Sequence, residues 1–109
     1  MNVIIKEPGK LGYEKDIPNT LEALQAEVGG FIEVVRVNSR LVAIVNEEGR
    51  QLGLRPNVLN LFGTIVFCGE DGEEFADIDQ KSSDLFRIGF NPVMKGKVWS
   101  LGGGVSNVR

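Results

Sequence analysis

Residues 20–53, TLEALQAEVGGFIEVVRVNSRLVAIVNEEGRQLG, decide the fold. Leu24 and its apolar neighbours recur at helical spacing, which predicts a short amphipathic helix. We expect the side chain of Asn19 to cap the first turn and Glu22 to return the bond, as in a capping box. Gly29 suits the left-handed position that ends a helix. A helix of only about ten residues is unstable alone in water, so this one must pack against another element.

Two runs rich in β-branched residues follow the helix. Residues 31–37 (FIEVVRV) and 41–45 (LVAIV) are separated by residues 38–40 (NSR), and this composition and loop length predict a β-hairpin. Neither run alternates cleanly between apolar and polar residues. We therefore expect strands buried on both faces, or strands with one face under the helix and the other under a partner chain.

Further elements flank this stretch. Residues 2–7 (NVIIKE) predict a first strand and residues 63–68 (GTIVFC) predict another. Residues 73–78 return as a brief strand or run directly into a helix. Asp79 is expected to cap this second helix over residues 80–87. We expect the helix to turn three apolar side chains toward the core: Leu85, Phe86 and Ile88.

Together these elements predict an α+β domain over residues 1–90. We expect three to five mostly antiparallel strands, one helix packed across a face of the sheet and a second short C-terminal helix. Residues 54–62 fit either a helical turn or a short strand. Residues 91–109 form a C-terminal extension, a strand-like segment and then a flexible tail. Its Trp99 is either a core element or an anchor for a partner, and an exposed strand there makes a homo-oligomer an open alternative.

The composition is that of one folded soluble domain. The 109 residues are 42% hydrophobic and 25% charged, with a net charge of −3, which disfavours a nucleic-acid partner bound through phosphates. The chain has no apolar run of the length that spans a membrane, and its N-terminus has no signal-peptide pattern. Cys68 is the single cysteine, which fits a reducing cytoplasm.

The chain contains no histidine, which removes the commonest general base and most zinc sites. We therefore expect a protein that is not an enzyme and that needs no cofactor or metal. An acidic run remains: its spacing fits no calcium-binding loop, and solvated charges explain it, but a carboxylate-dependent metal enzyme stays an alternative. The run consists of Glu70, Asp71, Glu73, Glu74, Asp77 and Asp79.

A polar loop follows the run at residues 41–45. A polar loop at a strand end can hold a small ligand or a partner, and two arginines can bind a phosphate or carboxylate. The simpler interpretation is a turn with solvated charges. With Trp99, the candidate binding residues are Asn46, Glu47, Glu48, Arg50, Arg55 and Asn57.

Four segments resemble, in the same order, the DUF3846 family, small phage and mobile-element proteins described as a domain of unknown function. The segments are IIKEPGK (4–10), NTLEALQAEVGGFIEVV (19–35), VNEEGRQLGLRPN (45–57) and GTIVFCGEDGEEF (63–75). The resemblance covers about residues 1–80. It implies a gene carried by phages or mobile elements of bacteria, whose small accessory proteins often counter host defences.

The leading hypothesis is a non-enzymatic protein that binds and inhibits a host protein, such as a defence component, in the cytoplasm of the bacterial host cell. It would bind through its strand edges, the loop at residues 46–57 and the C-terminal tail. The first alternative is a small-molecule binder that sequesters a nucleotide-like signal in an oligomeric pocket, with Arg50 and Arg55 on the phosphate. The second is the metal enzyme built on residues 70–79.

Overall fold

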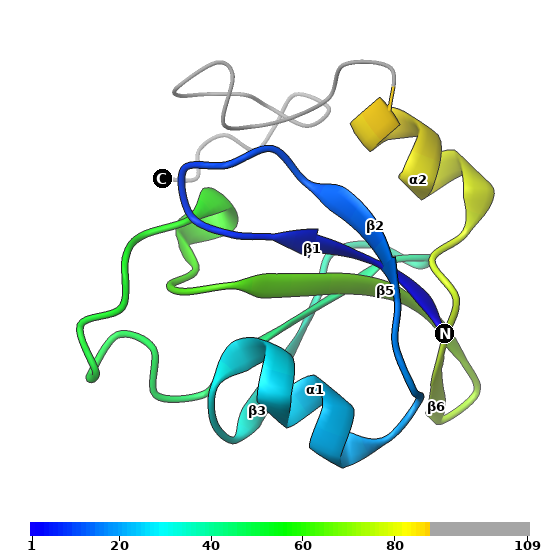
Figure 1. The fold of residues 1–109 in the computed structure, drawn as a ribbon. Coiled ribbons are helices and arrows are strands. Elements are labelled where there is room, and N and C mark those ends of the chain that lie inside the picture. The colour runs from blue at the N-terminus through cyan, green and yellow to red at the C-terminus, as the bar shows by residue number, and fades with distance from the viewer. Residues whose placement is uncertain (88–109) are drawn as a thin grey trace.

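The computed structural model describes the backbone of residues 1–87 and the side chains of residues 1–84. Figure 1 shows a twisted sheet with helix α1 on one face. In chain order the elements are β1 (Asn2–Lys6), β2 (Tyr13–Asp16), α1 (Leu21–Val28), β3 (Ile32–Arg36), β4 (Val42–Asn46), the 3₁₀ helix η1 (Val58–Asn60), β5 (Ile65–Asp71), β6 (Glu74–Ala76) and α2 (Gln80–Arg87).

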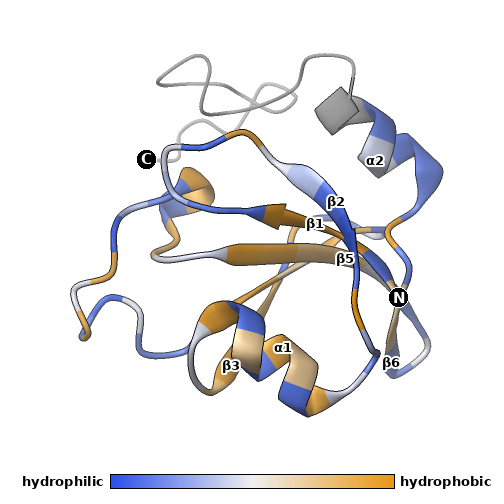
Figure 2. Ribbon diagram, viewed as in Figure 1, coloured by the Kyte–Doolittle hydropathy of each residue, from blue (hydrophilic) through white to orange (hydrophobic). Residues whose placement is uncertain are grey.

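The strands form one antiparallel sheet in the order β2-β1-β5-β4-β3, and β6 pairs with the end of β5. The α+β class predicted from the sequence is confirmed. The described residues contain six strands instead of three to five, because residues 13–16 pair with β1 and residues 74–76 pair with β5. In Figure 2 the central strand β5 is hydrophobic, whereas the edge strand β2 and helix α2 are largely hydrophilic.

Both faces of the sheet are buried at its centre. Every residue of β4 is buried, with Val42 and Ile44 in the cluster under α1 and Ala43 and Val45 in the cluster on the opposite face. The 3₁₀ helix η1 packs against this second cluster through Val58 and Leu59. Because β4 alternates between two buried faces, it has no polar face, which explains its unbroken apolar sequence.

The expectation of burial on both faces fails for the other strand of the hairpin. β3 pairs with β4 on one side and ends the strand order on the other. Val34 is 41% exposed and Phe31, just before the strand, is 67% exposed. Helix α1 packs against one face of β3, and no described segment pairs with the outer edge of this strand. An apolar run therefore predicted two-sided burial at a position where the sheet stops.

The N-terminal cap of α1 differs from the prediction. Thr20, in extended backbone geometry, accepts a bond from the Ala23 N–H at 3.1 Å. The Asn19 amide instead donates to the carbonyl oxygen of Phe75 at 2.9 Å. The capping box of Asn19 and Glu22 is therefore wrong. Gly29 ends the helix at a φ of 80°, as predicted.

Other predictions concern the second half of the chain. Of the open alternatives, residues 54–62 contain the helical turn η1, and residues 73–78 contain the brief strand β6. Asp79 caps α2 by accepting from the Ser82 N–H at 3.1 Å, as predicted. None of the described helices is long and apolar enough to cross a membrane. The predictions for the side chains of Leu85 and Phe86, for Ile88 and for residues 91–109 with Trp99 lie outside the described residues.

Candidate functional site

Asn46, the last residue of β4, holds the start of the polar loop in place. Its buried side chain donates to the carbonyl oxygen of Val28 at 3.3 Å and accepts from the Glu48 N–H at 2.7 Å. A Cβ on Gly30 would lie 2.8 Å from the Asn46 amide nitrogen, so this contact requires glycine. Asn46 therefore ties the end of α1 to the turn after β4.

Asn57 has a comparable role at the other end of the loop. Its Nδ2 donates to the carbonyl oxygens of Lys6 at 2.9 Å and Gly63 at 2.8 Å. Its Oδ1 accepts from the Val58 N–H at 2.8 Å and from the Lys6 Nζ at 3.3 Å. Two donors and two acceptor sites are the full capacity of an asparagine side chain. All hydrogen-bonding groups of the Asn57 side chain are therefore used within the fold, and they hold η1 against the end of β1.

Lys6 is a buried lysine that the sequence did not mark. It follows Ile4 on the same face of β1, and its side chain is fully buried. The described contacts of its Nζ are neutral oxygens, those of Asn57 and of the Glu7 carbonyl at 3.0 Å. Burial lowers the pKa of Lys6, because the charged ammonium loses its solvation.

Two consecutive residues of the loop have left-handed backbone geometry. Leu59 has a φ of 61° and Asn60 a φ of 60°, values that cost free energy for residues other than glycine. Leu59 packs onto the core, while Asn60 lines an adjoining pocket. Held strain of this kind gathers at functional sites, which directs attention to the pocket.

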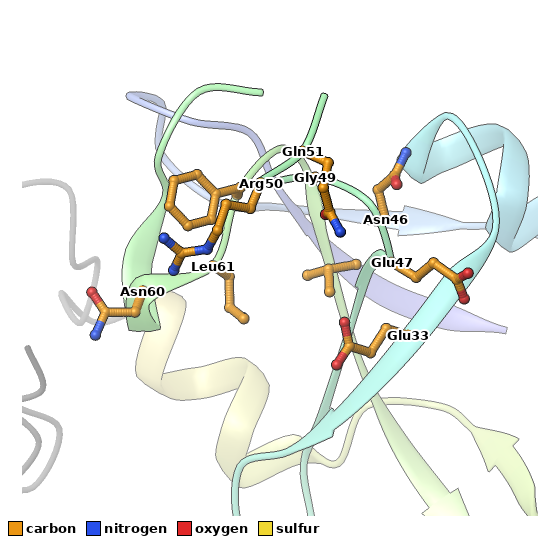
Figure 3. Close-up of a pocket in the computed structure, with 10 residues that line it drawn as sticks. Glu33, Asn46, Glu47, Gly49, Arg50, Gln51, Asn60 and Leu61 are labelled. Atoms are coloured by element: carbon orange, nitrogen blue, oxygen red, sulfur yellow. The ribbon is translucent and has the colours of Figure 1, made fainter. Parts of the chain in front are cut away.

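The pocket has a volume of about 430 Å³ and lies between β3, the end of β4 and the segments at residues 47–51 and 60–62. Val45, Leu61 and Phe62 supply its apolar surface. Figure 3 shows Glu33 and Glu47 on one side and Arg50 on the other, with Asn60 beside Arg50. The polar lining is completed by Asn46, Gly49 and Gln51.

The charges around the pocket are not matched with one another. The Arg50 guanidinium lies over the Phe62 ring, 4.6 Å from its centroid, as a cation–π pair. Among the described residues, neither Arg50 nor Glu33 nor Glu47 makes an ion pair. Glu33 stands opposite Val45, so Glu47, two residues beyond Val45, is its diagonal neighbour on the same face. In Figure 3 the Glu33 carboxylate points into the pocket and the Glu47 carboxylate points away from it, and neither has a cation partner among the described residues.

The outer edge of β3 runs along this pocket. The Phe31 carbonyl accepts from the Glu47 N–H at 2.8 Å and the Val37 N–H donates to Leu41 at 2.9 Å, so the odd-numbered residues bond inward to β4. Backbone groups alternate in an antiparallel ladder. The N–H and C=O groups that point outward from the sheet are therefore those of Ile32, Val34 and Arg36.

The structure brings some of the predicted site residues together and separates others. Asn46, Glu47 and Arg50 line the pocket, whereas Glu48 is exposed outside it. Arg55 lies over a different turn, since a Cβ on Gly9 would come within 3.1 Å of its Nη2. The two arginines therefore do not form one phosphate clamp. Asn57 is committed to the fold, and Trp99 lies outside the described residues.

Sequence reasoning missed several residues of the pocket. Glu33 could have been found from the hairpin register, which places it opposite Val45. The other residues follow η1, and nothing in the sequence indicates that this segment returns to β3. They are Asn60, Leu61 and Phe62.

The acidic run is dispersed. Glu70 pairs with Arg36, whose hydrogen bond lowers the pKa of the Glu70 carboxyl group. Asp77 accepts from the Asn2 N–H at 2.8 Å, and hydrogen bonding from Ser82 lowers the pKa of Asp79. Over residues 1–87, no three His, Cys, Asp or Glu side chains gather as a metal site would require. Burial raises the pKa of the Cys68 thiol to about 12, which agrees with the predicted core role.

The fold and the pocket define a small α+β protein whose edge strand β3 has no described partner on its outer side and runs beside a pocket lined by Glu33 and Glu47. Residues 1–90 match the family described as a domain of unknown function (DUF3846), and the chain belongs to that family. The match extends the predicted resemblance by about ten residues. No curated protein and no solved structure matches the chain.

Proposed function

We propose that this protein is a non-enzymatic binding protein that holds an extended segment of a partner protein as an additional strand along β3. One observation carries the proposal: the outward backbone groups of Ile32, Val34 and Arg36 end the sheet without a described partner strand. Such an edge is a template for another strand, whose main chain supplies affinity and whose side chains supply specificity.

The opposite edge of the sheet offers a comparison. β2 is the sequence Tyr-Glu-Lys-Asp, and charged residues on an edge strand discourage pairing. The Ser83 hydroxyl of α2 donates to the Glu14 carboxylate at 2.9 Å, and α2 lies beside β2 in Figure 1. The β3 edge has instead the half-exposed Val34 at its centre and the exposed Phe31 before it. β3 is therefore the better docking edge.

We propose further that the partner is a host protein, such as a defence component, and that binding inhibits it in the cytoplasm of a bacterial cell. The support for this biological role is the family resemblance, which implies a phage or mobile-element gene. The geometry contributes the mode of binding. Capture of a strand can inhibit a protein without any catalytic group, because the captured segment is withdrawn from its own fold or partner.

The test is capture of partners from bacterial lysate with the wild-type protein and with Val34→Pro. Proline removes the outward N–H at position 34 and leaves the inward bonds of Glu33 and Val35 to β4 intact. Val34→Thr is the control, since it changes the side chain but keeps the N–H. We expect the wild-type protein and Val34→Thr to retain the same partner and Val34→Pro to lose it. Equal capture by a folded Val34→Pro protein would contradict the proposal.

A small-molecule binder is the second candidate, and the pocket favours it. A volume of about 430 Å³ is in the range of ligand pockets, and Arg50 on Phe62 could meet an anionic group and a flat ring. A nucleotide at a hundred times its dissociation constant would add about 2.7 kcal/mol to the unfolding free energy. Thermal melts with a nucleotide mixture, repeated on Arg50→Ala, separate this candidate from strand capture.

A further inference from the structure

We infer that the pocket beside β3 receives a lysine or arginine side chain of the captured strand, and that the adjacent residue of that strand is apolar and covers Val34. The inference rests on the proposed function and makes it more specific. It follows from three features: the parity of the strand edge, the unpaired carboxylates of Glu33 and Glu47, and the exposure of Val34 on the other face.

The parity of the edge decides which residue of the captured strand enters the pocket. Residues directly opposite each other in neighbouring strands point their side chains to the same face, with Cβ atoms about 5 Å apart. Glu33 lines the pocket, so the residue opposite Glu33 also presents its side chain there. Its neighbour, opposite Val34, presents its side chain on the face that carries α1. Adjacent residues of the captured strand therefore meet different surroundings.

The charges select a cation at the first of these positions. Glu33 and Glu47 are diagonal neighbours on the pocket face and have no ion pair among the described residues. Arg50 lies over Phe62, on the side of the pocket toward Asn60 in Figure 3, and does not neutralise them. Other described carboxylates do have a cation partner, such as Glu27 with Lys15 at 2.8 Å. A basic side chain opposite Glu33 would place a cation next to the Glu33 carboxylate as its cross-strand neighbour.

The apolar lining suits the stem of the same side chain. Lysine and arginine place their methylene groups on apolar surfaces while the charged head stays with polar groups. Val45 lies next to Glu33 through the strand register, and Leu61 lies between Asn60 and Glu33 in Figure 3. The stem of a basic residue would cover these two side chains and direct its head toward the Glu33 carboxylate.

The other face of the edge selects an apolar neighbour. Val34 is 41% exposed, and Ile32 on the same face packs against the cluster under α1. Arg36, at the far end of that face, already pairs with Glu70. An apolar side chain opposite Val34 extends this cluster outward. The preferred ligand is thus an extended segment with a basic and an apolar residue in succession.

A second copy of this chain fits less well. An antiparallel pair of β3 strands centred on Val34 would place the partner's Val35 opposite Glu33, which leaves the carboxylates without a cation. Placing the partner's Arg36 there would set an inward-bonding residue opposite an outward-bonding one, and the ladder could not form. Pairing between copies is therefore an outcome that the test must distinguish.

The test starts from a library of random twelve-residue peptides, in which each displayed peptide has one sequence. From this library, the peptides that bind are selected separately on each of three proteins. They are the wild-type chain, the charge-reversed Glu33→Lys/Glu47→Lys, and Glu48→Lys. Glu48 is exposed and outside the pocket, so its reversal matches the charge change without altering the site. Thermal melts confirm that the variants fold, which we expect because all three glutamates are exposed.

We expect the wild-type protein and Glu48→Lys to enrich a basic residue next to an apolar one, and the double variant to enrich an acidic residue instead. For a selected peptide, replacing the basic residue by norleucine should weaken binding about tenfold, the loss of one charge-assisted contact. Peptides without a basic preference, or an unchanged preference on the double variant, would overturn the inference while leaving strand capture intact. The proposed function fails if Val34→Pro does not abolish binding of the selected peptides. It also fails if no peptide binds β3 and only a second copy of this chain pairs with that edge.

Discussion

The buried ammonium group of Lys6 donates a hydrogen bond to the Oδ1 atom of Asn57, 3.3 Å away. The two residues join the end of β1 to the segment that contains η1 and lines the pocket. The same asparagine binds the carbonyl oxygens of Lys6 and Gly63, so one side chain holds both ends of this segment against the sheet. The shape of the pocket therefore depends on a contact that lies outside it.

Asn57→Ala should destabilise the protein by about 2–4 kcal/mol, because it removes the partners of two backbone carbonyl groups and of the Val58 N–H. Chemical denaturation measures the change, with Glu48→Ala as the exposed control from the same loop. An Asn57→Ala curve that coincides with that of the control would show that Asn57 does not fasten the segment.

Lys6 should make stability rise with pH in the alkaline range. Burial lowers the pKa of Lys6 in the folded state below the ordinary 10.5. Between those two pKa values the unfolded chain binds more protons than the folded one, so stability rises with pH across that window and is constant above it. The stability of Lys6→Met relative to wild type should therefore fall as the pH approaches 10.5.

Denaturation of both proteins at several pH values tests this. The Cys68 thiol acts in the opposite direction above its ordinary 9.0, because its folded pKa is raised to about 12 and the unfolded thiol ionises first. Since both proteins contain Cys68, its contribution cancels in the difference. A difference that does not change with pH would mean that Lys6 keeps an ordinary pKa in the folded state.

Leu24→Ala should cost about 2–5 kcal/mol, most of the stability of a small domain. Leu24 is 1% exposed and lies in the cluster between α1 and the sheet. Leu21, on the first turn of the same helix, is 52% exposed, so Leu21→Ala should cost far less. Thermal melts of the two variants, side by side, give the comparison, and equal losses would indicate that α1 does not cover the sheet.

Thr20→Ala should cost about 1 kcal/mol through loss of the helix cap. Asn19→Ala removes only an exposed bond to the Phe75 carbonyl and should cost less. The two variants are compared by their denaturation midpoints and by the rate of hydrogen exchange at the Ala23 backbone amide. This exchange should become faster in Thr20→Ala alone. The reverse order of the two losses would restore Asn19 as the cap.

Chelation should leave the melting temperature unchanged. Carboxylates of the acidic run already accept from protein donors, as Glu70 does from Arg36 and Asp77 does from Asn2. Calorimetry before and after treatment with a chelator is the measurement. A drop that magnesium or calcium reverses would favour the metal-enzyme alternative.

The fold could be predicted where its determinants are local. The Gly29 turn, the hairpin around residues 38–40 and the Asp79 cap all depend on residues close together in the chain. The cap of α1 was misassigned because Asn19 and Thr20 are both good acceptors at the right place. The choice between them depends on Phe75, whose carbonyl takes up the Asn19 side chain and is remote in sequence.

The candidate site was only partly predictable for the same reason. Asn46 and Asn57 look like surface residues in the sequence, yet both are held by remote backbone groups, those of Val28 and Lys6. Glu47 and Arg50 were found because a polar loop after a buried strand is exposed at its end. The open edge of β3 could not be read from its sequence, because apolar strands look alike whether or not a neighbour follows.

The strand order also sets the sequence of events in folding. β1 leaves the ribosome before its inner partner β5, with which it pairs Ile4 opposite Phe67. The β3–β4 hairpin can close as soon as it is synthesised and β1 can pair early with β2, but the inner edge of β1 has no partner until β5 has emerged. Pairing between segments so remote in sequence slows folding. Until β5 emerges, the newborn chain exposes the inner edge of β1, and in this interval a chaperone would bind that edge or neighbouring chains would aggregate on it.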